Sequence, residues 1–387
     1  MAEANVIERG RWKFAANYNH NDGCLPQELT TEILLRLPTK SLVRFKLVSK
    51  LWSFLISNPN FIKSHSLNPN NMPLTLLYDS KYRLLKSVSL GKRDENLNLN
   101  PTVLEVNPCF LYIEEYLYDG ILGSCHGLIC TYSNQTKLIY LCNPLTKETK
   151  EISFPNPKII SYDCKDIRNM SWFDFVPSIN DYKILLVFGT RTSNLRIHVY
   201  SMKDNKWREL NTSDFKSLVI TGGYIGWERN VALINEKLHF VCFNFNHRTQ
   251  FIAKFDLVQD IFELMPIILN DNNNNYRYCY GEFVDIVQGT ISIHGRGRYI
   301  LPGGSWVMEA WKLEKLFSLE LSGFPIGFTS CGGLILRRPN PDDNHEYELV
   351  FVDLTQNPPS QIQLGRSERA RYMLDYVETL VSPFSLP

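Results

Sequence analysis

The adjacent residues Cys125 and His126 come nearest, in this sequence, to a catalytic constellation. A cysteine paired with a histidine can supply a thiolate nucleophile for acyl transfer, because the imidazole accepts the thiol proton. The pair lies in the run Gly123–Tyr132, which has the pattern of a β-strand. Adjacent residues of a strand point to opposite faces. We therefore predict that these two side chains do not form a nucleophile–base pair.

The other motifs of enzyme sites are incomplete. His345 and Glu346 begin a zinc-protease motif, but no second histidine follows one helical turn later. Gly295 and Gly297 lack the third glycine of a dinucleotide-binding loop. Neither a G-x-x-x-x-G-K-[ST] phosphate loop nor a G-x-S-x-G nucleophile elbow occurs. We therefore predict no catalytic residue, no metal site and no cofactor, and we interpret the chain as a non-enzyme.

The cysteines bear on the compartment in which the protein works. There are nine of them, at irregular spacings and without a C-x-x-C pair. Zinc knuckles need ligands paired at such short spacings. We interpret the cysteines as reduced, mostly buried thiols of a protein in the cytoplasm and/or nucleus, where disulfides are rare. A disulfide framework is the alternative.

Charge and hydropathy exclude two kinds of partner. The formal net charge is +1, whereas proteins that bind polyanions concentrate a strong positive excess. No apolar run approaches the roughly 18 residues needed to cross a bilayer. The segment Met1–Gly10 also lacks the apolar core of a secretory signal. We therefore expect neither nucleic acid nor a membrane as a partner.

Three parts of the chain differ in composition and in the spacing of their apolar residues. Residues 1–23 are polar and rich in asparagine, which predicts a disordered tail. Residues 24–65 have a helical period in their apolar positions. Residues 66–387 consist of short β-like runs separated by Gly, Pro, Asn and Asp. The sequence thus predicts an α+β multidomain protein, with a small helical module followed by a large all-β domain.

The helical module is predicted to contain three short helices. The first begins at Pro26, which suits a first helical turn, and ends at Pro38. Its apolar positions recur at steps of three and four and share one face: Leu29, Ile33, Leu34 and Leu37. The second and third carry Leu42, Phe45 and Val48, and then Trp52, Leu55 and Ile56 behind an N-cap at Ser49. So short a module buries little apolar surface. We expect a partner protein to cover what it leaves exposed.

The β region repeats one phrase, an apolar strand, a polar turn and a second apolar strand. Its copies are Leu138–Phe154, Ile197–Leu210, Ile252–Pro266, Trp306–Leu321 and Leu349–Leu364. Their spacing is in the range of propeller blades. The last β-like run, Tyr372–Ser382, could pair with Leu74–Tyr78 and close a ring, which would remove exposed strand edges. We predict a propeller of about six blades; an irregular β-sandwich is the alternative.

The stretch Leu25–His65 resembles an F-box. Its marks occur in order: Leu25-Pro26, Glu28-Leu29, Ile33-Leu34, Leu37-Pro38, Lys40-Ser41-Leu42, Phe45-Lys46, Val48-Ser49-Lys50 and Trp52. The remainder resembles the kelch-like F-box-associated domain of plant F-box proteins. Its marks are Gly123–Cys130, Cys142–Glu148, Asn180–Lys183, Val199–Ser201, Trp207-Arg208, Phe255–Leu257, Trp306–Met308 and Tyr376–Val381.

This resemblance implies a role. F-box proteins dock onto the Skp-type adaptor of a cullin–RING ubiquitin ligase, and their C-terminal domains hold a target protein for ubiquitination. By motif match, the adaptor contacts would be Leu25, Pro26, Leu29, Ile33, Leu37 and Pro38, supported or extended by Leu42, Val48 and Trp52. The helical pattern alone leaves open that these residues only fill the core of the module.

Candidate contacts to a target are weaker predictions from residue type. Aromatic and arginine side chains dominate binding hot spots, and loops on a rigid scaffold carry recognition. The candidates are Tyr224, Trp227, Tyr276, Tyr278, Arg296, Arg298 and Tyr299. The ligase receptor is the favoured function. The alternatives are an adaptor-binding protein that delivers nothing for degradation, and a propeller that binds a glycan or small molecule.

Overall fold

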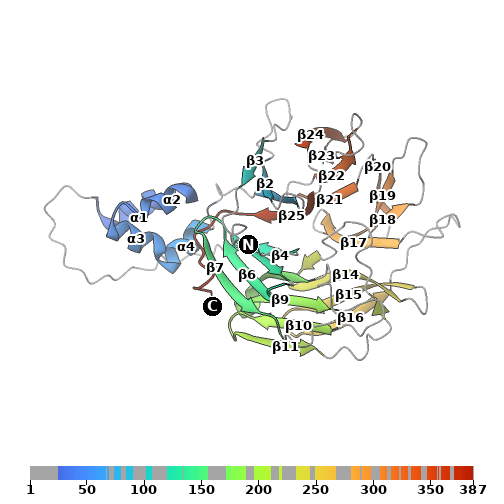
Figure 1. Ribbon diagram of the computed structural model, residues 1–387, viewed down its shortest axis with the longest axis horizontal. Coiled ribbons are helices and arrows are strands. Elements are labelled where there is room, and N and C mark those ends of the chain that lie inside the picture. Colours follow the sequence, from blue (N-terminus) through green and yellow to red (C-terminus); the bar gives the residue numbers. More distant parts are fainter. Residues whose placement is uncertain are drawn as a thin grey trace, which may run out of the picture.

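A computed structural model describes most of the helical module and the strands of the β domain (Figure 1). The described residues are 25–66, 68, 74–79, 84–89, 102–106, 120–133, 135–155, 171–188, 196–210, 218–219, 232–244, 249–266, 280–287, 290–297, 306–311, 315–321, 324–329, 333–340, 347–354, 356, 359–366 and 370–386.

The helical module contains four helices, so the prediction of three is corrected. They are α1 (Gln27–Leu35), α2 (Thr39–Phe45), α3 (Lys50–Ser57) and α4 (Pro59–Ser66). The start signal of α4 was missed: the side chain of Asn58 accepts a hydrogen bond from the Asn60 amide at 2.9 Å, and Pro59 occupies the first helical position. Ser49 caps α3 as predicted, accepting from the Trp52 amide at 3.1 Å.

The core of the module draws on all four helices and on the far end of the chain. Its buried side chains are Leu34, Leu42, Leu55, Ile56, Phe61 and Leu380. The buried ring of His65 in α4 also hydrogen-bonds the Leu37 carbonyl at 2.8 Å, which ties α4 to the end of the first helical segment. A residue more than 300 positions from α4 in the sequence therefore belongs to the core of the module.

The described strands of the β domain form six antiparallel sheets, which we number as blades in chain order. Blade 1 contains β25 (Ala370–Tyr376), β1 (Leu74–Asp79), β2 (Leu84–Ser89) and β3 (Thr102–Val106). Blade 2 contains β4 (Gly120–Cys125), β5 (Leu128–Ser133), β6 (Leu138–Asn143) and β7 (Glu148–Ser153). Blade 3 contains β8 (Trp172–Val176), β9 (Asp181–Phe188), β10 (Arg196–Ser201) and β11 (Lys206–Leu210), with the 3-10 turn η1 (Pro177–Ile179) between its first two strands.

The remaining blades continue the same plan around the ring (Figure 1). Blade 4 has five strands: β12 (Leu218–Val219), β13 (Ala232–Ile234), β14 (Lys237–Asn244), β15 (Thr249–Asp256) and β16 (Ile261–Pro266). Blade 5 contains β17 (Tyr280–Val287), β18 (Thr290–Gly297), β19 (Trp306–Trp311) and β20 (Lys315–Leu321). Blade 6 contains β21 (Phe324–Phe328), β22 (Leu334–Pro339), β23 (Tyr347–Asp353) and β24 (Ser360–Arg366).

The two ends of the β domain close the ring within one blade. Strand β25 pairs antiparallel with β1, from Leu74 opposite Tyr376 to Tyr78 opposite Tyr372. This pairing confirms the predicted closure, which removes the free edges that an open ring would expose. The strand ends at Tyr376, however, so residues 377–382 of the predicted run are outside the sheet.

The repeated phrase of the sequence corresponds to the last two strands of each of blades 2 to 6. Its polar turn has a recurring chemistry. In blade 2, Asn143 Oδ1 accepts from the Leu145 amide at 2.9 Å, and Lys147 adopts a positive φ of 63°. In blade 4, Asp256 Oδ1 accepts from the Val258 amide at 2.9 Å. Such short polar side chains stabilise tight turns, which explains why these hairpins are visible in the sequence.

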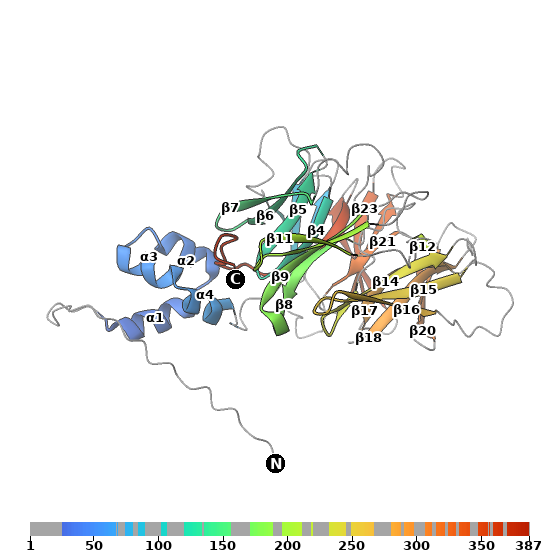
Figure 2. The same cartoon turned by 90° about the horizontal axis from the view of Figure 1, so that it is seen from below.

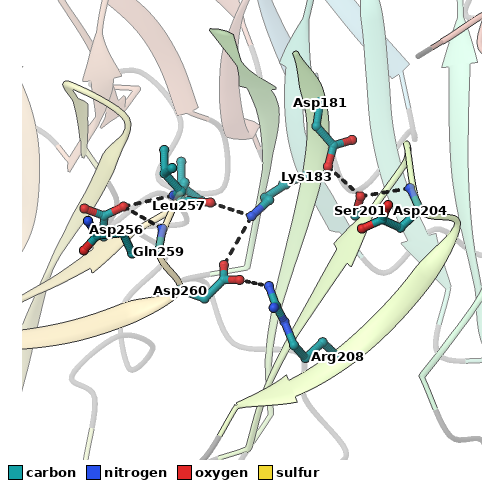
Figure 3. Close-up of polar contacts among 10 residues, drawn as sticks. Asp181, Lys183, Ser201, Asp204, Arg208, Asp256, Leu257, Gln259 and Asp260 are labelled. Atoms are coloured by element: carbon teal, nitrogen blue, oxygen red, sulfur yellow. Dashed lines mark hydrogen bonds and ion pairs between the residues drawn. The ribbon is translucent and has the colours of Figure 1, made fainter. Parts of the chain in front are cut away.

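A motif of the family resemblance, residues 180–183, joins blade 3 to its neighbours. Asn180 adopts the left-handed conformation that ends η1, with φ 49°. Asp181 accepts hydrogen bonds from the Ser201 hydroxyl at 2.6 Å and from the Lys203 amide at 2.9 Å. Lys183 crosses to blade 4, as Figure 3 shows. The motif is thus explained by contacts within and between blades.

The contact of Lys183 with blade 4 is a buried ionic link. Its ammonium donates to the Leu257 carbonyl at 2.5 Å and lies 3.2 Å from Asp260 Oδ1. The same carboxylate also pairs with Arg208 (Figure 3). Burial and the neighbouring Arg208 lower the pKa of Lys183. Two carboxylate oxygens and a carbonyl therefore satisfy two cations at the junction of blades 3 and 4.

Replacing Lys183 by methionine should destabilise the β domain by about 2–4 kcal/mol, because it leaves a buried carbonyl and part of a buried carboxylate without a partner. Urea denaturation of the full chain measures the change. The matched control is Lys254→Met. Lys254 pairs with the exposed Glu263 within blade 4, so this change should cost less than about 1 kcal/mol. Equal losses in both variants would contradict a special role of the Lys183 link.

Candidate functional site

Helix α1 presents a row of exposed apolar side chains, which we call the α1 row: Leu25, Leu29 and Ile33. Their exposed fractions are 61%, 52% and 49%. Leu29 and Ile33 are four positions apart in α1 and so lie on one side of the helix, and Leu25 lies two positions before the helix begins. Leu34 is buried in the core of the module, which shows that α1 has apolar residues on two sides. The inward side, with Leu34, packs in the core of the module, and the outward side, with Leu29 and Ile33, is exposed to solvent.

A second exposed group lies at the start of α3 and just before it, and we call it the α3 group: Leu47, Val48, Leu51 and Phe54. Only Val48 was among the predicted contacts. Leu47 is 89% exposed, the most of any large apolar side chain in the described residues. Leu47, Leu51 and Phe54 could have been predicted from the sequence. The segment has more apolar residues than one buried face of a short helix can accommodate, so some of them must be exposed. Exposed apolar groups of this kind mark binding surfaces.

The other predicted contact residues divide between surface and core. Pro26 and Pro38 are exposed, each just before a helix. Leu37 and Trp52 are half-buried and pack against the core of the module. Leu42 was predicted to support or extend the docking surface. It is fully buried in the core of the module, so it can support that surface only from inside.

Four basic residues lie on α2 and just after it, where they could meet an acidic partner: Lys40, Arg44, Lys46 and Lys50. Two of them face the β domain instead. The Lys40 ammonium pairs with Glu378 at 2.9 Å. Burial lowers the pKa of Lys46, an effect that the nearby Glu148 carboxylate partly opposes. Arg44 and Lys50 are exposed and the Lys40 side chain is 66% exposed, so of the four only Lys46 is half-buried.

The match to known families decides what this module is. Residues 23–64 match the F-box domain family, and residues 79–282, more than half of the chain, match the F-box associated beta propeller domain family. This chain is an F-box protein. The exposed α1 row and α3 group belong to the F-box, and the propeller match spans blades 2 to 4 and reaches into blades 1 and 5.

Curated relatives of this F-box protein are plant proteins. An F-box/kelch-repeat protein of Arabidopsis thaliana is 28% identical over 252 residues, which cover 62% of this chain and 65% of the relative. Another F-box protein of Arabidopsis thaliana is 27% identical over 303 residues, covering 77% of this chain and 69% of the relative. The chain thus spans less than two thirds of the first of these relatives.

A solved TolB from Acinetobacter baumannii superposes with a TM-score of 0.42 at 13% identity, covering 85% of this chain and 73% of that one.

The predicted target contacts of this F-box protein are almost all outside the described residues. These are Tyr224, Trp227, Tyr276, Tyr278, Arg298 and Tyr299. Arg296 is placed in β18, where it is opposite Tyr280 of β17 and Met308 of β19. The assignment of these residues to a target surface therefore stays a prediction.

The adjacent Cys125 and His126 of the F-box protein serve the structure of blade 2. Cys125 ends β4, and His126 follows in the turn with φ 48°. The imidazole Nδ1 hydrogen-bonds the Tyr182 hydroxyl of blade 3 at 2.7 Å. Burial and the neighbouring Asp174 carboxylate raise the pKa of the Cys125 thiol, which opposes formation of a thiolate. The pair thus lacks the activated cysteine that nucleophilic catalysis requires.

Two further features are absent from the described part of the chain. No group of three or more His, Cys, Asp or Glu side chains there could hold a metal ion. No helix there is long and apolar enough to cross a membrane.

Proposed function

We propose that this protein is the substrate receptor of a Skp–cullin–F-box ubiquitin ligase. The F-box docks onto the Skp-type adaptor, and through it onto the cullin and RING subunits, while the propeller holds a target protein. The receptor itself has no catalytic role. It accelerates ubiquitin transfer by raising the effective concentration of the target near the ubiquitin-loaded partner.

The exposed α1 row is the observation that carries this proposal. About half of each of its three residues is exposed to solvent, although the core of the module, which includes Leu380, is buried. An apolar row at four-residue spacing is the pattern by which a helix occupies a groove on a partner. The three described free cysteines, Cys125, Cys130 and Cys142, fit a reducing compartment, so we place the complex in the cytoplasm and/or nucleus.

The double variant Leu29→Ala plus Ile33→Ala should lose adaptor binding while the protein stays folded. Apolar side chains at the centre of an interface contribute about 1–2 kcal/mol each, so the dissociation constant should rise roughly 30- to 1,000-fold. Titration of purified adaptor against the full chain, followed by calorimetry, measures it. The control is Glu32→Ala, an exposed polar site on the same helix, which should change affinity less than about threefold.

Wild-type affinity in the double variant would refute docking through α1. A second measurement separates a ligase receptor from an adaptor-binding protein that delivers nothing. Proteins bound by the propeller should persist longer in cells that express the double variant in place of the wild type. Unchanged half-lives of these proteins would favour the non-degradative alternative.

A further inference from the structure

Five residues near the C-terminus, Val377–Val381, connect the F-box to the propeller, and we call them the bridging segment. They follow β25 directly and form part of a motif of the family resemblance that the docking and ring-closing roles leave unexplained. Both Figure 1 and Figure 2 show the C-terminal chain, in dark red, between the helices and the strands β6 and β7 of blade 2.

Alternate residues of the bridging segment contact the F-box. Leu380 is 2% exposed and lies in the F-box core with Leu42 and Phe61. Glu378 accepts a hydrogen bond at its carbonyl from the Thr39 hydroxyl at 3.1 Å, and its carboxylate pairs with Lys40. The exposed ion pair adds little, whereas burial of a leucine in so small a core adds much.

The residues between them contact the propeller. The Thr379 hydroxyl donates to the His126 carbonyl at 2.6 Å. The side-chain amide of Asn143 donates to the carbonyls of Thr379 and Val381, at 3.0 Å and 2.7 Å. Val381 packs against the apolar core shared by blades 2 and 3. Five consecutive residues therefore engage both modules, through side chains and backbone carbonyls.

The turn between β4 and β5 is shaped to receive the bridging segment. Gly127 has φ 78°, and a β-carbon there would clash with the Thr379 hydroxyl and lie 2.8 Å from the Val377 carbonyl oxygen. Asn143, which ends β6, uses its Oδ1 for its own turn and its Nδ2 for the bridging segment, so both ends of its amide are engaged. Two turns of blade 2 thus hold the segment on the propeller.

We propose that the bridging segment positions the F-box on the propeller, so that the two modules move as one rigid unit. The rigid link matters for function only if the proposed ligase role holds. A fixed orientation would then present a target at a constant place relative to the docked adaptor. The core of the F-box is completed only when the C-terminal end of the chain, which also closes the ring, has reached its position.

The variant Asn143→Asp tests the positioning role with little change in shape. Aspartate keeps the oxygen that accepts from the turn amides, but it replaces the amide donor by an oxygen that repels the carbonyls of Thr379 and Val381. Single-molecule energy transfer reports the orientation, between dyes attached through noncanonical amino acids at the exposed residues Glu32 and Glu151 of the full chain. We expect one narrow distribution for the wild type, and a broader one shifted to lower efficiency for the variant.

The control is Asp256→Asn, the equivalent turn position of blade 4, which should leave the distribution narrow. A wild-type distribution with several states, or a variant as narrow as the wild type, would overturn the positioning role. The adaptor is absent from this measurement. A failure of adaptor binding would therefore refute the proposed function without affecting this result, and the reverse also holds.

A second variant, Leu380→Ala, tests whether the bridging segment completes the F-box core. Hydrogen exchange of the amides in α1 to α4 should accelerate at least about tenfold, because a buried leucine is removed from a small core. Leu349→Ala in blade 6, at an equally buried site distant from the helices, should leave the exchange of these helices unchanged. Equal exchange in the wild type and Leu380→Ala would show that the F-box core does not depend on the C-terminus.

Discussion

Replacing Leu42 by aspartate should unfold the F-box and abolish adaptor binding, while the propeller stays folded. Leu42 is completely buried among the side chains of the F-box core. An unpaired carboxylate there costs at least several kcal/mol, either as a buried charge or as the work of protonating it. A module of this size has little stability to lose. The expected result is therefore loss of the module rather than a weaker contact.

Hydrogen exchange of the full-length Leu42→Asp variant, measured beside adaptor titration, separates the two readings of this residue. Unfolding predicts that the amides of α1 to α4 lose protection together with adaptor binding. The control is Arg44→Asp, which introduces the same side chain at an exposed site on the same helix and should retain the protection of all four helices. If Leu42→Asp kept that protection and lost only binding, Leu42 would be a contact residue, as its place in the motif suggested.

The sequence alone does not reveal which apolar residues of the F-box are buried and which form the docking surface. Spacing identifies a helix with an apolar stripe, but it does not say whether a given leucine faces the module or a partner. In α1, Leu34 is buried and the neighbouring Ile33 is half exposed, although both lie within the predicted stripe. The difference depends on where α3, α4 and Leu380 pack. Leu380 in particular is distant in sequence, so no local pattern could have included it in the core.

The architecture of the β domain could be predicted more fully, because the turns of many of its hairpins have recognisable polar residues in the sequence. The polar turns at Asn143 and Asp256 are encoded by local hydrogen bonds, so the repeat was visible and the blade number was predicted correctly. The hairpin of β2 and β3 was missed, since residues 90–101 separate its strands without a comparable turn motif. The link of Lys183 to blade 4 could not be predicted either, because it joins residues from two separate hairpins.

Gly123 is the position at which a single added methyl group should damage the propeller most. It lies in β4, where the pairing with β5 shifts register, and it faces the backbone of β8 in the next blade. A β-carbon at Gly123 would collide with the Phe173 carbonyl oxygen and lie 3.2 Å from its carbon. Backbone atoms cannot rotate away as a side chain can. Accommodating alanine therefore requires β4 and β8 to separate.

Separation of these strands would disturb the apolar core shared by blades 2 and 3, which contains Leu122 and Phe173. We expect Gly123→Ala to lower the free energy of unfolding of the propeller by about 3 kcal/mol or more, at the upper end of the cost of overpacking. Urea denaturation of the full chain, followed by tryptophan fluorescence, measures the loss. A large effect from one methyl group is expected because the β-carbon is fixed to the β4 backbone and the carbonyl that it meets belongs to the β8 backbone.

The matched control is Gly327→Ala in β21, at a similar register shift of blade 6. There the added β-carbon would meet the terminal methyl of Met373 at 2.8 Å, and a methionine side chain can move aside at little cost. This variant should lose less than about 1 kcal/mol. Equal losses at the two glycines would mean that added volume alone decides the outcome, and that close approach of the β4 and β8 backbones does not limit how blades 2 and 3 pack.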